Sequence, residues 1–365
     1  MTTIDIPAGP SDLTAEWLTY ALHEGGAVRD ARVASFETES VGEGSGFIGQ
    51  LARVALRYEG DAPDAPRSLI AKFPGASEGG RAIGMMFRFY EREIRFYDDV
   101  GQRVAMRIPR RYHSEMDLTQ GRFALLLEDL APSRCGDQLA GCSYEDARAA
   151  VTELAKFHAA WWQHPDLADR LDWMPMVNDP VQQLAQAAYA QAWQPFVDNF
   201  GKRLSAEMLS IAERVGQNVV EFQNRIADEP RTIMHGDYRA DNMFFRSPVG
   251  GAEFAVVDWQ IASRGRGIFD VTYFVCGALP KEIRRQHEMD LLHLYHDTLQ
   301  GGGVRDYPWE QCLREYRMMA LYYMVYVVIS LGTLDFANER GLALFNTLLE
   351  RSTTAIAELE AAELF

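Results

Sequence analysis

Residues 234–245 read MHGDYRADNMFF, and residues 254–258 read FAVVD. Short apolar runs enclose the polar residues of this stretch. Apolar runs of this length, bounded by polar residues, are typical of buried strands, so the sequence predicts short strands joined by a polar loop. The side chains of Asp237, Asn242 and Asp258 would then stand at strand ends, where they can be held rigidly and still face a cleft.

Two carboxylates and an amide in this arrangement suit metal-dependent phosphoryl transfer. One carboxylate takes the proton of the acceptor hydroxyl, while an amide and a second carboxylate hold magnesium on the nucleotide phosphates. Magnesium usually takes one or two protein carboxylates, plus water and phosphate oxygens. We therefore expect Asp237 to be the catalytic base and Asn242 and Asp258 to be metal ligands. The competing interpretation is a polar hairpin without chemistry.

Two other residues of the loop have simpler interpretations. We expect His235 to form hydrogen bonds within the loop and to orient it, rather than to act as a catalyst. Asp241 is expected to face solvent or to cap the loop.

Lys72 lies within the apolar run of residues 68–73, which reads SLIAKF and predicts a strand. A lysine in such a run needs a partner or a ligand, because burying an ammonium group alone is costly. Glu93, on a helix predicted over residues 81–100, is the expected partner, and Glu91 is the second choice. A lysine held in this way could contact the non-terminal phosphates of a nucleotide. The alternative is an edge-strand lysine that faces solvent.

Gly44, Ser45 and Gly46 lie in a glycine-rich stretch, GEGSGFIG, at residues 42–49. In a dinucleotide-binding fold a helix would follow these glycines. Here residues 50–58 alternate as a strand, which predicts a strand–loop–strand flap whose backbone can approach phosphates. A glycine-rich hairpin without a ligand is the alternative.

The backbone at Glu128 and Leu130 could meet the edge of a purine, because these residues end the last strand before a change of pattern. An ordinary acidic turn explains them equally well. We place the domain boundary here, with a nucleotide-binding lobe at residues 1–130 and a helical catalytic and substrate-binding lobe at residues 131–365. The expected strands are 32–41, 50–58, 68–73, 104–112 and 123–127, and the expected helices are 12–23, 81–100, 143–162, 204–222, 281–299, 309–331 and 340–362.

The composition limits the classes of partner and the cellular location that we expect for this protein. The net charge is −16, and no dense run of lysine and arginine is present, which argues against nucleic-acid binding. Four scattered cysteines indicate reduced thiols rather than a disulfide framework. The first ten residues do not resemble a signal peptide. The most apolar run, residues 320–331, is shorter than the roughly 20 residues of a membrane span. We expect a cytoplasmic protein.

With these residues in hand, the chain resembles the aminoglycoside phosphotransferase and choline kinase-like superfamily, and within it the ecdysteroid kinase-like branch. The motifs that carry the resemblance are HGDYRADN (235–242), VDWQ (257–260), GRGIFDV (265–271), EIRFY (93–97), LEDL (127–130) and LAKFHA (154–159).

The resemblance implies an α+β, two-lobed protein-kinase-like fold, with a small antiparallel-sheet N-terminal lobe, a large mostly helical C-terminal lobe, and ATP and Mg²⁺ between them. It implies the same roles for Asp237, Asn242 and Asp258, phosphate binding by Lys72 with Glu93, and a brace for the catalytic loop at Asp270.

The path from Asp258 to Asp270 is short, with only eleven residues between them. That leaves little room for the activation segment of a protein kinase, and no Ala-Pro-Glu follows. A hydroxyl of a small organic molecule is therefore the expected acceptor, and the expected enzyme is a small-molecule kinase.

An apolar or steroid-like alcohol, or a hydroxyacyl compound, is favoured as the acceptor because the acidic residues of 281–365 are spread out. Aromatic residues could line its pocket or belong to the core; they are Trp161, Trp162, Trp173, Trp193, Phe196, Tyr322, Tyr323 and Tyr326. The alternatives are an antibiotic-inactivating or choline-type kinase and a nucleotide-binding pseudokinase scaffold.

Overall fold

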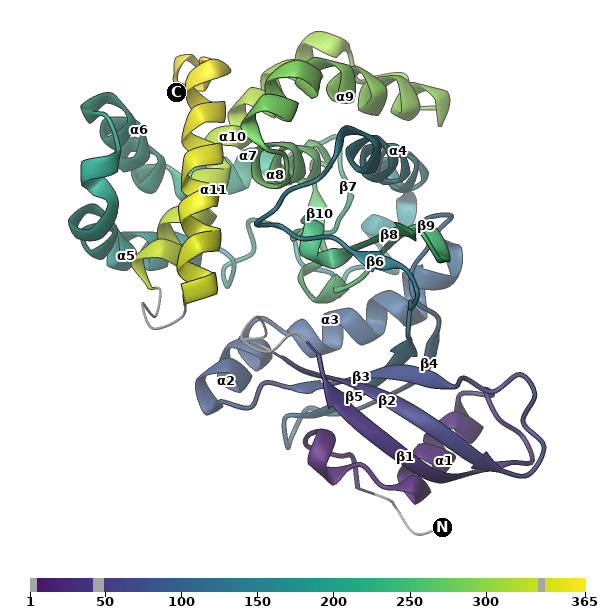
Figure 1. Ribbon diagram of the computed structural model, residues 1–365. Coiled ribbons are helices and arrows are strands. Elements are labelled where there is room, and N and C mark those ends of the chain that lie inside the picture. The colour runs from purple at the N-terminus through teal and green to yellow at the C-terminus, as the bar shows by residue number, and fades with distance from the viewer. Residues whose placement is uncertain (1–4, 42–48, 334–338) are drawn as a thin grey trace. The chain divides into compact units, whose positions relative to one another are not determined.

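The computed structural model describes residues 5–41, 49–333 and 339–365 (Figure 1). The chain forms two compact units. Unit 1 comprises Met1–Arg103 and Ile108–Pro132, and unit 2 comprises Val104–Arg107 and Ser133–Phe365. Each unit has its own secondary structure and its own buried residues, so each is described by itself.

Unit 1 is built on a five-stranded antiparallel sheet with the strand order β1-β2-β3-β5-β4. Its strands are β1 (Arg32–Ser40), β2 (Gly49–Glu59), β3 (Ser68–Pro74), β4 (Arg111–Asp117) and β5 (Arg122–Glu128). Leu69 and Ala71 of β3 pack in one core with helix α1 (Ala15–Glu24). Because neighbouring side chains of a strand point to opposite faces, Lys72 turns away from α1. The small antiparallel sheet is as expected.

Helices α2 (Glu78–Met86) and α3 (Phe89–Arg95), with a π-helical turn at Phe96–Val100, occupy the region predicted as one helix over residues 81–100. The prediction of one continuous helix was wrong. Arg88 has a left-handed backbone, with φ of 55°, and this conformation separates α2 from α3.

The strand predicted over residues 104–112 was also wrong. No strand is present from Val104 to Arg110, a stretch that the structure describes fully, and β4 begins only at Arg111. Val104–Arg107 belong to unit 2, where the carbonyl of Arg107 accepts a hydrogen bond from the amide of Val256 at 3.1 Å.

Unit 2 is mostly helical (Figure 1). Its helices are α4 (Tyr144–Trp161), α5 (Leu184–Phe200), α6 (Ala206–Gln217), α7 (Val219–Ala227), α8 (Ile268–Ala278), α9 (Lys281–Gly301), α10 (Trp309–Gly332) and α11 (Glu339–Glu358). Helix α10 packs against α5, α8 and α11 and is buried along most of its length. The helix predicted over residues 204–222 is divided at Asn218 into α6 and α7.

Two small sheets in unit 2 carry the polar loop. β7 (Thr232–Met234) pairs with β10 (Ser263–Gly265), and β8 (Met243–Ser247) lies between β6 (Arg134–Cys135) and β9 (Gly250–Val256). The three short strands predicted around residues 234–258 are confirmed as β7, β8 and β9. The loop between β7 and β8 is therefore anchored in a different sheet at each end.

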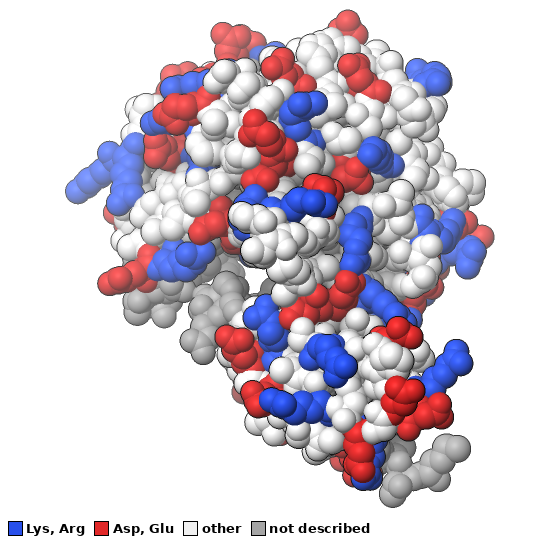
Figure 2. All heavy atoms as spheres, turned by 45° about the vertical axis from the view of Figure 1, so that its right-hand side comes forward, with Lys and Arg blue, Asp and Glu red and all other residues white. Residues whose placement is uncertain are grey.

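No helix among the residues described here combines the length and the apolar character that a membrane crossing demands. On the face shown in Figure 2, acidic and basic side chains are interspersed, so no charge of one sign covers that face.

Candidate active site

The loop after β7 turns sharply at Gly236. Its φ is +83°, and a Cβ at this position would lie 2.8 Å from the carbonyl oxygen of Ile261. Both the backbone angle and the close approach require glycine. The loop then passes through a 3₁₀ turn at Ala240–Asn242 and enters β8. Asp237 and Asn242 are thus fixed at the two ends of a short and tightly turned segment.

Asp270, in the first turn of α8, braces this loop. Its Oδ2 accepts a hydrogen bond from the amide of His235 at 2.7 Å, and its Oδ1 accepts one from the amide of Gly236 at 2.9 Å. The side chain has no exposure to solvent. His158 of α4 supports it, since its Nε2 lies 3.3 Å from Oδ2 while its Nδ1 lies 3.0 Å from the hydroxyl of Tyr295. One buried carboxylate therefore satisfies two successive backbone donors.

His235 has the orienting role that its sequence context predicts. Its Nε2 lies 2.9 Å from the carbonyl oxygen of Val257, and its Nδ1 accepts a hydrogen bond from the amide of Asp237 at 3.2 Å. These partners require a neutral ring that is protonated at Nε2. The ring joins the loop to the end of β9.

Asp237 receives hydrogen bonds from three side chains. Its Oδ2 accepts from Nδ2 of Asn242 at 3.0 Å and from Nε of Arg239 at 3.1 Å. Its Oδ1 accepts from the hydroxyl of Tyr273 at 2.8 Å. The Asp237 side chain keeps 16% of its surface exposed. It is therefore held in place and still reachable.

The donor set next to Asp237 fits magnesium. The amide of Val257 donates to the carbonyl of Asn242 at 2.9 Å, so Asp258 follows directly on the residue paired with Asn242. Because Nδ2 of Asn242 is engaged by Asp237, the group it can offer a cation is the oxygen Oδ1. One amide oxygen and one carboxylate leave most of the coordination shell to phosphate and water, as magnesium requires. In keeping with this open set, the described residues contain no group of three His, Cys, Asp or Glu side chains that could enclose a metal.

Asp241 caps the loop instead of facing solvent. Its Oδ1 accepts a hydrogen bond from the amide of Gln138 at 2.8 Å, and Oε1 of Gln138 accepts one from the amide of Ala240 at 2.7 Å. Arg351 of α11 is buried and donates to the carbonyls of Gln138 at 2.8 Å and Leu139 at 3.1 Å. The C-terminal helix therefore supports the loop through residues 138 and 139.

Lys72 and Glu93 form the pair predicted from the sequence. Nζ of Lys72 lies 2.6 Å from Oε2 of Glu93, and both side chains are buried inside unit 1. Glu91, the second choice, instead pairs with Arg88 at 2.6 Å and lies 3.7 Å from Arg95.

The other cofactor-binding candidates are placed as follows. Glu128 ends β5, where Oε2 accepts a hydrogen bond from the amide of Arg110 at 2.9 Å, and Leu130 is buried. Gly44, Ser45 and Gly46 lie outside the described residues.

Four supporting residues escaped the sequence analysis as site residues: Tyr273, His158, Gln138 and Arg351. For Tyr273 a signal existed, because it stands three residues after Asp270 and such residues share a helix face. His158 lies in the motif LAKFHA (154–159), which contributes to the family resemblance, although its contact with Asp270 was not inferred. Nothing in the local sequence marks Gln138 or Arg351, since they reach the loop from distant elements.

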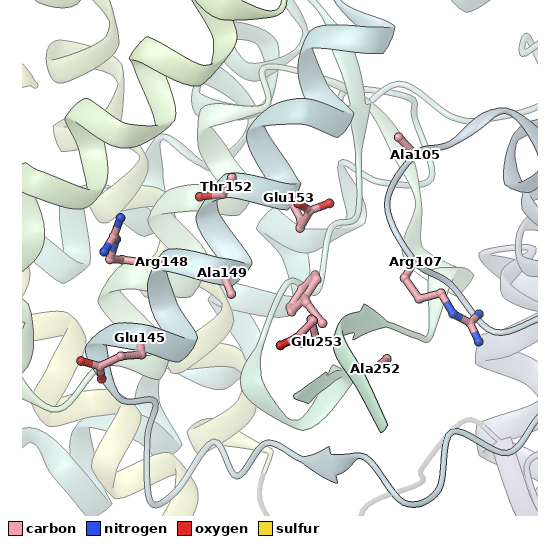
Figure 3. A pocket seen from close by; sticks show the side chains of 10 residues that line it. Ala105, Arg107, Glu145, Arg148, Ala149, Thr152, Glu153, Ala252 and Glu253 are labelled. Atoms are coloured by element: carbon pink, nitrogen blue, oxygen red, sulfur yellow. The ribbon is translucent and has the colours of Figure 1, made fainter. Parts of the chain in front are cut away.

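A cavity of about 680 Å³ lies elsewhere in unit 2 (Figure 3). Its lining comes from α4, from β9 and from the segment before β4 in sequence, and it comprises Ala105, Arg107, Glu145, Arg148, Ala149, Thr152, Glu153, Ala252, Glu253 and Phe254. None of these is a candidate catalytic or metal-binding residue. Its charged groups are of both signs, so the cavity does not indicate a particular ligand.

Residues 43–302 match the ecdysteroid kinase-like family. The chain belongs to this family. The ecdysteroid kinase-like branch indicated by its motifs is confirmed.

Solved structures with the same fold have low sequence identity to this family member. A putative aminoglycoside phosphotransferase from Ralstonia eutropha JMP134 is 14% identical, with a TM-score of 0.55 over 94% of this chain and 98% of that one. An amicoumacin kinase in complex with AMP-PNP, Ca²⁺ and Ami is 10% identical, with a TM-score of 0.55 over 93% and 96%. A choline kinase from Cryptosporidium parvum Iowa II is 9% identical, with a TM-score of 0.52 over 94% and 97%. These similarities confirm the expected kinase-like fold.

A curated relative, the uncharacterized oxidoreductase dhs-27 of Caenorhabditis elegans, is 21% identical over 357 residues. The match covers 86% of this chain and only 41% of that protein. The ecdysteroid kinase-like chain thus spans less than half the length of this relative.

Proposed function

We propose that this ecdysteroid kinase-like protein uses ATP and Mg²⁺ to phosphorylate a hydroxyl of a small, largely apolar organic molecule. The observation that carries the proposal is the position of Asp237, which is fixed by three side-chain donors, is partly exposed, and is bonded to the candidate metal ligand Asn242.

In this proposal Asp237 accepts the proton of the acceptor hydroxyl as the hydroxyl oxygen attacks the terminal phosphorus and ADP leaves. Asn242 and Asp258 would hold Mg²⁺, which when bound neutralises charge on the phosphates. Asp270 keeps the loop backbone in place. Arg239, whose guanidinium lies beside the base, adds positive charge where the phosphoryl group would be transferred.

Nucleotide binding is assigned to the lobe of residues 1–130, and catalysis and acceptor binding to residues 131–365. Lys72, steadied by Glu93, would contact the non-terminal phosphates. Backbone groups at Glu128 and Leu130 would meet the purine. We further propose phosphate contacts for Gly44, Ser45 and Gly46.

The rings around Tyr273 support the proposed acceptor class. Its ring lies 4.8 Å from that of Tyr323, 5.6 Å from that of Tyr326 and 5.7 Å from that of Phe269. This cluster supports an apolar alcohol, such as a steroid-like or hydroxyacyl compound.

The test is ADP release from ATP and Mg²⁺ with a library of alcohols that includes steroid-like, hydroxyacyl, choline and aminoglycoside compounds. Turnover should fall by about 10²–10⁴-fold in Asp237→Ala, the usual contribution of a general base. Asp258→Ala should also lose turnover, because it lacks a proposed metal ligand. Asp306→Ala, at an exposed position of unit 2, is the matched control and should keep wild-type turnover.

Turnover that survives in both active-site variants would disprove the mechanism. Nucleotide binding without phosphoryl transfer to any alcohol or to water would indicate a pseudokinase scaffold instead. Turnover restricted to choline or aminoglycosides would reject the apolar acceptor.

A further inference from the structure

Tyr273 stands one turn after Asp270 on α8, and the two side chains act on the same loop. Asp270 holds the backbone of the loop at His235 and Gly236, while the hydroxyl of Tyr273 donates to Oδ1 of Asp237 at 2.8 Å. One helix therefore positions both the loop and the side chain of the candidate base.

The carboxylate of Asp237 can accept only a limited number of hydrogen bonds, and most of these are already formed. An ionised carboxylate has about four lone-pair sites, two on each oxygen. Both sites of Oδ2 are used, by Nε of Arg239 at 3.1 Å and by Nδ2 of Asn242 at 3.0 Å. Tyr273 uses one site of Oδ1. A single site, on Oδ1, remains for an acceptor hydroxyl.

We infer that Tyr273 is a positioning and selectivity residue: its hydroxyl occupies one lone pair of Oδ1 and so directs the acceptor hydroxyl to the other. The inference rests on the proposed role of Asp237 as the base. An acceptor bound at the remaining site would lie beside the phenol, so that its carbon skeleton could meet the partly exposed rings of Tyr273 and Tyr326. Water is a poorer occupant of such a site, because it gains nothing from the aromatic surface.

The phenol is suited to this task in two respects. Burial, and then the charge of Asp237, hold the pKa of Tyr273 well above its ordinary value, so the group is a neutral donor at physiological pH. Its ring is packed against Phe269, Tyr323 and Tyr326. Removing the oxygen alone should therefore leave the ring in place and open a second site on Oδ1.

The experiment compares the wild type with Tyr273→Phe in two assays, phosphorylation of an alcohol identified by the library and ADP release with water as the only acceptor. For the alcohol, kcat should fall by about tenfold, the usual worth of one hydrogen bond to a charged group, while the KM for ATP stays within about twofold. Because a second site is open to water, the ratio of hydrolysis to transfer should rise by about tenfold.

Tyr307→Phe is the matched control. The hydroxyl of Tyr307 also donates to a carboxylate, Oε2 of the buried Glu315, at 2.8 Å, but Tyr307 does not contact the loop. This variant loses the same kind of hydrogen bond and should keep the wild-type ratio of hydrolysis to transfer. A ratio that changes equally in both variants would show a general structural effect and overturn the inference.

Other outcomes are decisive as well. If the wild type transfers phosphate and Tyr273→Phe keeps its kcat and its ratio, the inference fails and the proposed function stands. If no alcohol is a substrate, ADP release into water is the readout, and it should rise in Tyr273→Phe; an unchanged rate overturns the inference. If Asp237→Ala releases ADP at the wild-type rate, the proposed function itself has failed.

Discussion

Lys72 and Glu93 form an ion pair that solvent hardly reaches, with side-chain exposures of 7% and 1%. Their attraction offsets the cost of removing both charges from water, yet apolar residues of similar size are often equally stabilising or better. A charged pair at this position of unit 1 is therefore better explained by a ligand than by stability, and the proposed phosphate contact supplies that ligand.

The role of the Lys72–Glu93 pair can be tested by measuring protein stability and nucleotide binding separately. Lys72→Met should lower the free energy of unfolding by about 3–5 kcal/mol, because the buried Glu93 loses the ammonium group that lies 2.6 Å from its carboxylate. The double variant Lys72→Met/Glu93→Leu should recover most of this loss. Urea unfolding measures both effects, and calorimetry should show weakened AMP-PNP binding in each variant.

Arg32→Met is the control, since the pair of Arg32 with Glu59 has the same 2.6 Å separation but side chains that are 69% and 63% exposed. Its effect on unfolding should stay below about 1 kcal/mol. A double variant that keeps wild-type affinity for AMP-PNP would contradict the proposed role of Lys72.

At the scale of elements, apolar patterning predicted four of the five strands in unit 1 and the three short strands around the loop. It failed where tertiary contacts decide the backbone. Periodicity across residues 81–100 cannot show that Arg88 turns left-handed, and the apolar residues of 104–110 gave no sign that Arg107 meets Val256 in unit 2. Helix α8 was not predicted because it is buried on nearly all sides and so has no polar face.

The candidate site also contains residues that the sequence predicted and residues that it did not predict. The residues that would perform chemistry lie in the loop between β7 and β8 and directly after β9, so their spacing identified them. The residues that hold them come from far along the chain. His158 lies 112 residues from Asp270, and Tyr273 lies 36 residues from Asp237. Such partners are fixed by packing between helices, which local sequence does not encode.

The entry into α8 offers a test at this scale. A Cβ at Gly267 would lie 2.5 Å from Nδ1 of His158 and 2.8 Å from Cγ2 of Thr232. Gly267→Ala should displace His158 from Asp270, lower the free energy of unfolding by about 1–3 kcal/mol and reduce kcat. Thermal unfolding and turnover measure the two effects.

Gly301, at the end of α9, is the matched position, because a Cβ there would meet nothing within 4 Å. Gly301→Ala should be neutral or stabilising by up to about 1 kcal/mol. Equal losses in the two variants would contradict the idea that His158 and Asp270 depend on the space at Gly267.

At the scale of the whole molecule, the candidate residues are distributed over both compact units. Lys72 and Glu93 belong to unit 1, whereas Asp237, Asn242 and Asp258 belong to unit 2. If Lys72 contacts the nucleotide and Asp258 holds its Mg²⁺, as proposed, binding would be linked to the unfolding of each unit, since binding free energy is lost when a site unfolds.

Calorimetric unfolding tests this coupling. At AMP-PNP a hundredfold above its Kd, with Mg²⁺, the wild type should gain about 2.7 kcal/mol, and separate transitions should move towards one. Asp258→Ala should lose the part of this gain that depends on Mg²⁺. A nucleotide that raises the midpoint of only one unit would show that a single unit binds it.

The position of Arg351 near the end of the chain predicts the effect of truncating mutations in the gene. It lies beyond residues 43–302, which match the family, yet its guanidinium holds the carbonyls of Gln138 and Leu139 behind the loop. A premature stop codon directly after residue 302 would leave every family motif in the translated product and remove this support. Alleles of that kind should behave as null alleles, although the coding sequence of each motif is intact.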